Sequence, residues 1–171
     1  MPTAFDKAFT TVVGIEGGYV NDPADSGGET CWGITIATAR AAGYTGPMKN
    51  LPINVAKAIY QANYWDKLKL TQIAQRSETL ALELFESGVN VGVNKVATWL
   101  QIGLNLLGAS IAADGQIGPG TLSAFNSIQP RDLNTLLKLM NIQQGAHYIA
   151  IAQNNPTQRK FIRGWLTRVQ L

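Results

Sequence analysis

Apolar residues near the N-terminus recur at steps of three and four, which is the spacing of one face of an α-helix. The positions that carry this pattern are Phe5, Phe9, Val12 and Val13. Thr3 is followed three residues later by Asp6, a spacing that resembles the capping box at the start of a helix. We therefore predict an amphipathic helix over residues 3–16.

Glu16 is the first candidate for chemistry. One more turn of the apolar face reaches Glu16, and Gly17 and Gly18 are expected to stop the helix just beyond it. A carboxylate beside apolar side chains resists ionisation, so its pKa rises and it can donate a proton near neutral pH. The alternative is a glutamate turned to solvent. The acidic residues downstream favour catalysis.

A polar segment with glycine and proline follows, and its composition favours tight turns. It carries three acidic side chains, Asp22, Asp25 and Glu29. We favour Asp25 as a second carboxylate across a cleft from Glu16, because a turn in the sequence Asn-Asp-Pro explains Asp22. Ordinary solvation of a loop is the alternative for all three.

The residues after this loop alternate as in a short strand. Thr30, Trp32 and Ile34 occupy every second position, which predicts a strand that closes a hairpin. A threonine hydroxyl near two carboxylates could position a water molecule, whereas Thr30 could equally be present for its β-propensity.

Helix-capping residues and helix breakers predict that the chain after Thr35 is mainly helical. Thr35 is expected to cap a short helix that runs to Ala42 and ends at Gly43. Later helices are expected to begin near Pro52, Ser77, Asn94, Pro119, Pro130 and Pro156. The helix after Ser77 is apolar around most of its circumference, as in a buried helix. The fold class expected is mainly α, with one small β-hairpin beside a cleft.

Composition narrows the possible functions. The chain has 171 residues, of which 46% are hydrophobic and 15% charged, so it can bury a core as one domain or two small packed lobes. No apolar run approaches the length of a membrane span, and no classical export signal is expected. With one cysteine (Cys31) and one histidine (His147), neither an internal disulfide nor a zinc site is expected.

The net charge of +3 is mild and partly collects near the C-terminus. The basic residues there are Arg159, Lys160, Arg163 and Arg168. Such a cluster could favour an anionic polymer such as the cell wall, or it could be the solvated face of a last helix. No basic stripe with interleaved aromatic residues is present, so no nucleic-acid partner is expected.

Three short strings in a fixed order carry a resemblance to a known family. Glu-Gly-Gly-Tyr, then Asn-Asp-Pro-Ala-Asp-Ser-Gly-Gly-Glu-Thr and Gly-Ile-Thr, span residues 16–35. They resemble the signature of glycoside hydrolase family 108, the N-acetylmuramidases of phage endolysins and bacterial secretion-activator proteins. The order Glu, acidic residue, Thr also resembles that of phage-type lysozymes. The resemblance implies an α+β lysozyme-like fold and cleavage of the β-1,4 bond between N-acetylmuramic acid and N-acetylglucosamine.

Roles follow from this resemblance position by position. Glu16 would be the general acid, Asp25 the second carboxylate, and Thr30 a residue that helps Asp25 hold water. Glycosidases use two carboxylates because one protonates the leaving oxygen while the other activates water or attacks the sugar. The phage-type resemblance favours the inverting mechanism. Expected substrate contacts are Tyr19, Trp32, Tyr64 and Asn90, with core packing the alternative for Tyr64 and helix capping the alternative for Asn90.

The second half carries a further resemblance. Residues 114–121 read Asp-Gly-Gln-Ile-Gly-Pro-Gly-Thr and resemble a motif of small peptidoglycan-binding helical modules. A structural turn held by Asp114 is the simpler explanation of the individual residues. We expect a catalytic lobe over residues 1–86 and a peptidoglycan-binding-like helical lobe over residues 87–171, packed as one compact unit.

The resulting hypothesis is a monomeric peptidoglycan hydrolase of the endolysin type, with glycan strands as its partner. No cofactor, no metal and no stable membrane insertion are expected. If phage-encoded, the enzyme would be made in the host cytoplasm and need a holin to reach peptidoglycan in the periplasm. The alternatives are a lytic transglycosylase that uses Glu16 alone and a non-catalytic peptidoglycan-binding protein.

Overall fold

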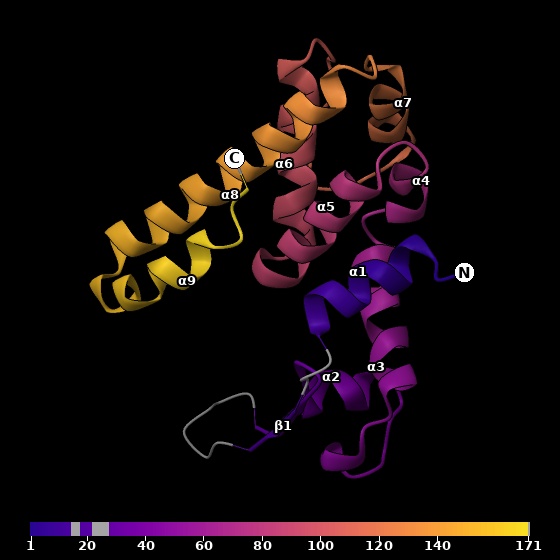
Figure 1. The fold of residues 1–171 in the computed structure, drawn as a ribbon, viewed down its shortest axis with the longest axis vertical. Helices are drawn as coiled ribbons and strands as arrows, with labels where there is room; N and C mark the ends of the chain where they lie inside the picture. Colours follow the sequence, from indigo (N-terminus) through magenta and orange to yellow (C-terminus); the bar gives the residue numbers. More distant parts are fainter. Residues whose placement is uncertain (15–17, 22–27, 171) are drawn as a thin grey trace. The chain divides into compact units, whose positions relative to one another are not determined.

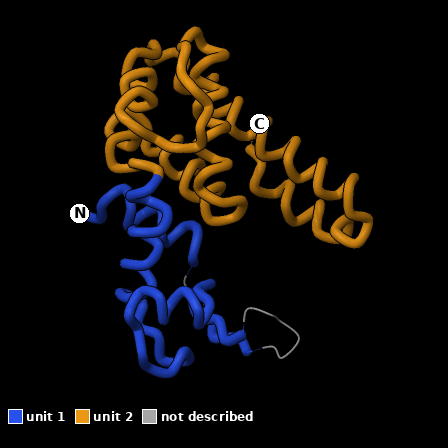
Figure 2. The backbone as a smooth tube through the Cα atoms, turned by 180° about the vertical axis from the view of Figure 1, so that it is seen from behind, with its two compact units in different colours: residues 1–67 blue, residues 68–171 orange. Residues whose placement is uncertain are grey.

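The fold is described from a computed structural model, which describes residues 1–14, 18–21 and 28–170. The chain divides into two compact units, Met1–Lys67 and Leu68–Leu171 (Figure 2). The described chain is mainly helical with a small three-stranded antiparallel sheet, which confirms the expected fold class. The predicted lobe boundary at 86/87 falls inside a continuous helix and stays a prediction.

The first unit begins with α1, Ala4–Val13, and its start confirms the predicted capping box (Figure 1). The Thr3 hydroxyl accepts a hydrogen bond from the Asp6 amide at 3.1 Å, and the Thr3 amide donates to the Asp6 carboxylate at 2.7 Å. The predicted helix end is wrong. Gly14 adopts a φ of 70° and ends α1. The last helical residue is therefore Val13, three residues before the predicted end at residue 16.

The sheet is formed by β1 (Tyr19–Val20), β2 (Thr30–Cys31) and β3 (Ile34–Thr35) in that order. Tyr19 pairs with Cys31, and Cys31 pairs with Ile34. The continuous strand predicted through Trp32 is wrong, because Trp32 and Gly33 both have positive φ angles of 53° and 71° and form a two-residue turn. Cys31 is buried, and burial raises the pKa of its thiol.

Four short helical elements complete the first unit. Thr35 caps α2 (Ile36–Ala41) through a hydrogen bond from Thr38, as predicted. Then come the 3₁₀ turn η1 (Met48–Asn50), α3 (Ile53–Tyr60) and the π-helical turn η2 (Gln61–Trp65).

Aromatic rings fill the interior of this unit. The ring centroids of Phe5 and Trp65 are 5.3 Å apart, and those of Phe9 and Tyr60 are 5.6 Å apart. Tyr60 and Trp65 are 5% and 2% exposed. Core packing therefore explains these two aromatic residues of the α3–η2 segment.

The second unit is built from helices. Its elements are α4 (Leu70–Ala74), α5 (Glu78–Val91), α6 (Val93–Leu106), α7 (Pro119–Ser127), α8 (Asp132–Asn154), the 3₁₀ helix η3 (Pro156–Phe161) and α9 (Ile162–Leu166). Ser77 caps α5 with its hydroxyl, as predicted. Asn94 does not cap α6, because Gly92 occupies that position and Asn94 lies within the helix. The last helix is broken into η3 and α9.

A polar network joins α5 to α8 inside this unit. The Ser87 hydroxyl donates to the Glu83 carboxylate at 2.8 Å and accepts from the Gln144 amide at 2.7 Å. Glu83 is 6% exposed, and burial raises its pKa to about 7. The carboxyl group is therefore about half protonated at neutral pH.

Gln101 of α6 organises the predicted turn around Asp114. Its amide nitrogen donates to the Asp114 carboxylate at 2.8 Å, and its carbonyl accepts from the Gly115 amide at 2.9 Å. Asp114 also accepts from the Gln116 amide at 2.9 Å. These bonds agree with a structural turn held by Asp114.

Candidate active site

The segment that carries Glu16 starts where α1 stops. Glu16 itself lies outside the described residues, and so do Asp22 and Asp25. Gly14 ends α1 before position 16, so the predicted helical extension to Glu16 is wrong. The catalytic roles of Glu16 and Asp25 stay predictions.

An apolar pocket of about 390 Å³ lies beside this helix end. Its lining residues are Phe9, Thr10, Gly14, Trp32, Ile53, Asn54 and Lys57. They come from the last turns of α1, the β2–β3 turn and the first turns of α3. A mostly apolar pocket with a few polar groups is the usual form of a small-ligand site.

Trp32 is held firmly at this pocket. Its indole nitrogen donates to the Leu51 carbonyl at 2.9 Å, and its own carbonyl accepts from the Tyr60 hydroxyl at 3.1 Å. A Cβ at Gly33 would lie 2.7 Å from the Tyr60 hydroxyl, so this turn needs glycine for both space and φ. The indole is half-buried, and its nitrogen is already hydrogen-bonded to Leu51. The ring can therefore contact a ligand in the pocket only through its apolar surface.

Lys57 is the charged side chain in the pocket lining. It pairs with the Asp6 carboxylate, and that hydrogen bond is the main reason that the pKa of Asp6 falls to about 2. Its ammonium also lies 5.9 Å from the Phe5 ring centroid. Asp6 therefore both completes the capping box of α1 and pairs with a lysine that lines the pocket.

Tyr19 and Glu29 meet at the edge of the sheet. Partial desolvation, followed by the nearby Glu29 carboxylate, raises the pKa of the Tyr19 hydroxyl. Tyr19 is 42% exposed and Glu29 is half-buried. Glu29 thus has a phenol partner, a contact that the sequence did not indicate.

The remaining predicted residues are placed as follows. Thr30 is half-buried in β2, and its hydroxyl donates to the Gly28 carbonyl at 3.4 Å. Tyr64 lies 5.5 Å from the Tyr60 ring and is not among the residues that line the pocket. Asn90, in the second unit, donates to the Glu86 carbonyl at 2.8 Å within α5. Their roles as catalytic or substrate contacts stay predictions.

The structure adds residues that sequence reasoning missed. Asn54 and Lys57 lie three positions apart in α3, which puts them on one helix face, and both line the pocket. The polar pair was visible in the sequence, but the distant turn at Trp32 that completes the pocket was not. No group of three or more His, Cys, Asp or Glu side chains in the described part of the chain is placed to hold a metal ion.

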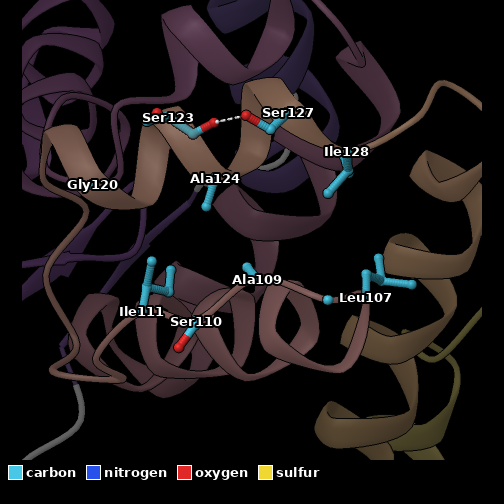
Figure 3. Close-up of a pocket in the computed structure, with 10 residues that line it drawn as sticks. Leu107, Ala109, Ser110, Ile111, Gly120, Ser123, Ala124, Ser127 and Ile128 are labelled. Atoms are coloured by element: carbon cyan, nitrogen blue, oxygen red, sulfur yellow. Dashed lines mark hydrogen bonds between the residues drawn. The ribbon is translucent and has the colours of Figure 1, made fainter.

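A second hollow of about 390 Å³ lies in the second unit, between residues 107–111 and α7 (Figure 3). No charged side chain lines it. The Ser127 hydroxyl on its wall donates to the Ser123 carbonyl at 2.9 Å. Small and neutral side chains make this hollow suited to an uncharged ligand.

Comparison with known proteins gives these sites a context. Residues 9–92 match the family described as glycosyl hydrolase 108. This region of the chain belongs to the glycosyl hydrolase 108 family. Residues 95–170 of this family member match a second model, described as a predicted peptidoglycan domain. The pocket at Trp32 therefore lies within the hydrolase region, and the neutral hollow within the peptidoglycan domain region.

The structure of Brucella abortus SagA is similar to this glycosyl hydrolase 108 chain, with 29% identity and a TM-score of 0.68. The match covers 96% of this chain and 88% of the SagA chain. Among curated proteins, none matches the chain. The two family regions together make the chain a glycoside hydrolase that acts on peptidoglycan.

Proposed function

We propose that this glycosyl hydrolase 108 member is an N-acetylmuramidase, with Glu16 as general acid and Asp25 as second carboxylate. The observation that carries the proposal is the apolar pocket at Gly14 and Trp32, within the hydrolase region. Glu16 follows Gly14 by two positions, and two residues of chain span at most about 7 Å. This limit is compatible with a Glu16 carboxylate that reaches the pocket, and it supports the proposed role.

The same kind of limit applies to Asp25 from the other side of the loop. It precedes Gly28 by three positions, which limits their separation to about 11 Å. Gly28 has a φ of 67°, and a Cβ built on it would contact the Ile36 side chain at 3.6 Å. The positive φ of Gly28 favours glycine at the residue where the described chain resumes.

The proposed reaction is hydrolysis of the β-1,4 bond between N-acetylmuramic acid and N-acetylglucosamine. Glu16 would protonate the departing sugar oxygen, and Asp25 would deprotonate the attacking water, with Thr30 helping to hold that water. The inverting mechanism requires roughly 6.5–9.5 Å between the two carboxyl groups. An apolar wall of Phe9 and Trp32 would favour the protonated form of the acid.

Substrate contacts are proposed on the same geometry. Aromatic rings bind the apolar faces of sugars, and the half-buried Trp32 and the exposed Tyr19 offer such faces. Asn54 and Lys57 would supply hydrogen bonds to acetamido or hydroxyl groups. These polar side chains would orient the glycan, while the rings supply most of the apolar contact.

The test is digestion of purified sacculi, with the fragments identified by mass spectrometry. We expect reducing muramic acid ends from the wild type, no turnover by Glu16→Gln, and a rate at least about a hundredfold lower for Asp25→Asn. Glu29→Gln is the matched control and should keep most of the activity. Anhydro ends would indicate a transglycosylase instead, and full lysis by Glu16→Gln would exclude the assignment of the acid.

We further propose an endolysin role: a monomer made in a host cytoplasm that acts on periplasmic peptidoglycan, with holin-dependent release if it is phage-encoded. The pairing of a hydrolase region with a peptidoglycan domain region supports this role. Sedimentation of the purified chain tests the monomer, and lysis after co-expression with and without a holin tests release.

A further inference from the structure

Basic and acidic side chains are distributed unevenly along the sequence. Nine basic and eleven acidic side chains precede Leu133, whereas five basic and no acidic side chains follow it. The later five are Lys138, Arg159, Lys160, Arg163 and Arg168. The excess positive charge of the protein therefore resides in its last 39 residues.

Most of these cations lie on a helical arm in which η3 and α9 fold back along α8 (Figure 1). Trp165 stacks on Tyr148 with ring centroids 5.5 Å apart. The Gln170 amide donates to the Asn141 side chain at 2.6 Å. These contacts fix one side of the returning segment against α8.

Two of the cations have structural partners. The Arg159 Nε donates to the Ala152 carbonyl at 3.0 Å, and Arg168 lies 3.6 Å from the Glu86 carboxylate. Lys160 and Arg163 are exposed, and neither forms an ion pair with a described residue. Their charges therefore face solvent.

Exposed apolar side chains accompany these two charges. Phe161 is 46% exposed and Leu166 is 42% exposed. The Lys160 ammonium lies 4.9 Å from the Phe161 ring centroid. The exposed side chains of residues 160–166 thus include both basic and apolar groups, and we call Lys160, Phe161, Arg163 and Leu166 the basic-apolar face.

A polyanionic wall polymer would use the cations but would leave Phe161 and Leu166 without a role. A bilayer surface uses both, because lipid phosphates attract the cations while apolar side chains enter the boundary below the headgroups. None of the described helices is long and apolar enough to cross a membrane. The contact would therefore be peripheral.

We propose that the basic-apolar face docks on anionic phospholipid bilayers through Lys160 and Arg163, with Phe161 and Leu166 inserted at the interface. Each basic residue near an anionic leaflet strengthens binding about fivefold. This attraction is screened by salt, because the Debye length is about 8 Å at physiological ionic strength. The inference does not depend on the catalytic roles of Glu16 and Asp25.

The experiment is co-sedimentation of the full chain with vesicles of phosphatidylglycerol and phosphatidylcholine, or of phosphatidylcholine alone. We expect binding to the anionic vesicles that weakens with salt. The double variant Lys160→Ser with Arg163→Ser should lower the partition coefficient by roughly 25-fold. Phe161→Ser with Leu166→Ser should lower the part of the binding that persists at high salt.

The matched control removes two exposed cations of the first unit, by Lys49→Ser with Lys67→Ser. It gives the same net charge and should keep binding within about twofold of the wild type. Equal losses in both double variants would reduce the effect to net charge and overturn the proposal. So would equal binding to phosphatidylcholine alone, no vesicle binding, or retention only on purified sacculi.

Discussion

The two units differ in what their interiors contain. In the first unit, rings of phenylalanine, tyrosine and tryptophan pack on one another. Aromatic residues and Cys31 apart, every buried polar side chain among the described residues lies in the second unit. These side chains are Glu83, Ser87, Gln101, Thr121, Asn141 and Gln144.

This difference separates two ways of fixing a fold. Apolar packing is tolerant of direction, so the first unit depends on how well its rings fill space. Hydrogen bonds are directional, so the network of Glu83, Ser87 and Gln144 requires one register of α5 against α8. The helical unit is therefore specified by polar contacts as well as by volume.

Among these variants, Trp65→Ala should have the largest effect on stability, because it disrupts the apolar packing of the first unit. Removing a 2% exposed ring that packs on Phe5 leaves a cavity, and we expect a loss of about 3–5 kcal/mol in the stability of the first unit. Hydrogen exchange resolved by segment should show faster exchange in α1 and α3, with α5 and α6 unchanged. Tyr44→Ala, at a half-buried loop position, is the control and should cost about 1 kcal/mol or less.

The second prediction concerns the buried carboxyl group of Glu83 and the pH dependence of stability that it causes. Because the folded pKa of Glu83 is raised to about 7, the folded state holds this proton more tightly than the unfolded chain. The contribution of Glu83 to stability should therefore be largest below about pH 4.5 and fall by about 3 kcal/mol as the pH rises to 7. Glu83→Gln should remove this fall, so denaturant unfolding at pH 8 should show a more stable variant.

Asp114→Asn provides the opposite control for that experiment. Hydrogen bonds from Gln101 and then from the Gln116 amide lower the pKa of Asp114, so its contribution is present at neutral pH and lost as the pH falls through the folded value. The asparagine variant should be less stable at pH 7, and the difference should close in acid. If the stability of Glu83→Gln and of the wild type changed with pH in the same way, Glu83 would not be a buried carboxyl group with a raised pKa.

The smallest effects concern the helix caps, one in each unit. Thr3→Ala removes the side-chain half of the α1 capping box, because the amide of residue 3 can still donate to the Asp6 carboxylate. Ser77→Ala removes the single side-chain bond at α5. Each should cost about 1 kcal/mol, expressed in its own unit. Hydrogen exchange of the first turns measures both, and the Thr3→Ser and Ser77→Thr variants should restore most of the loss.

Local signals allowed a large part of the fold to be predicted. Thr3, Thr35 and Ser77 cap helices as their sequences indicate, because capping depends on residues within one turn. The end of α1 was missed although Gly14 directly follows the apolar run. The sequence pointed to Gly17 and Gly18 as the stop, but Gly14, with a positive φ of 70°, ends the helix earlier.

Features that depend on distant residues could not be predicted. Trp32 reads as a strand residue by alternation, yet its bonds to Leu51 and Tyr60 fix it in a turn with positive φ. Nothing local in the sequence singles out Glu83, and its place in a buried network appears only through Ser87, whose hydroxyl also accepts from Gln144 of α8. The pocket likewise needs α1, the hairpin turn and α3 together.

Cys31 offers a natural reporter for the first unit. It is the single cysteine of the chain, 4% exposed at the centre of the sheet, with a thiol pKa raised by burial. Because the thiolate is the reactive form, an alkylating reagent should react slowly with the closed hairpin. The rate of alkylation therefore measures how often the strands around Cys31 separate, and no label has to be attached to the protein.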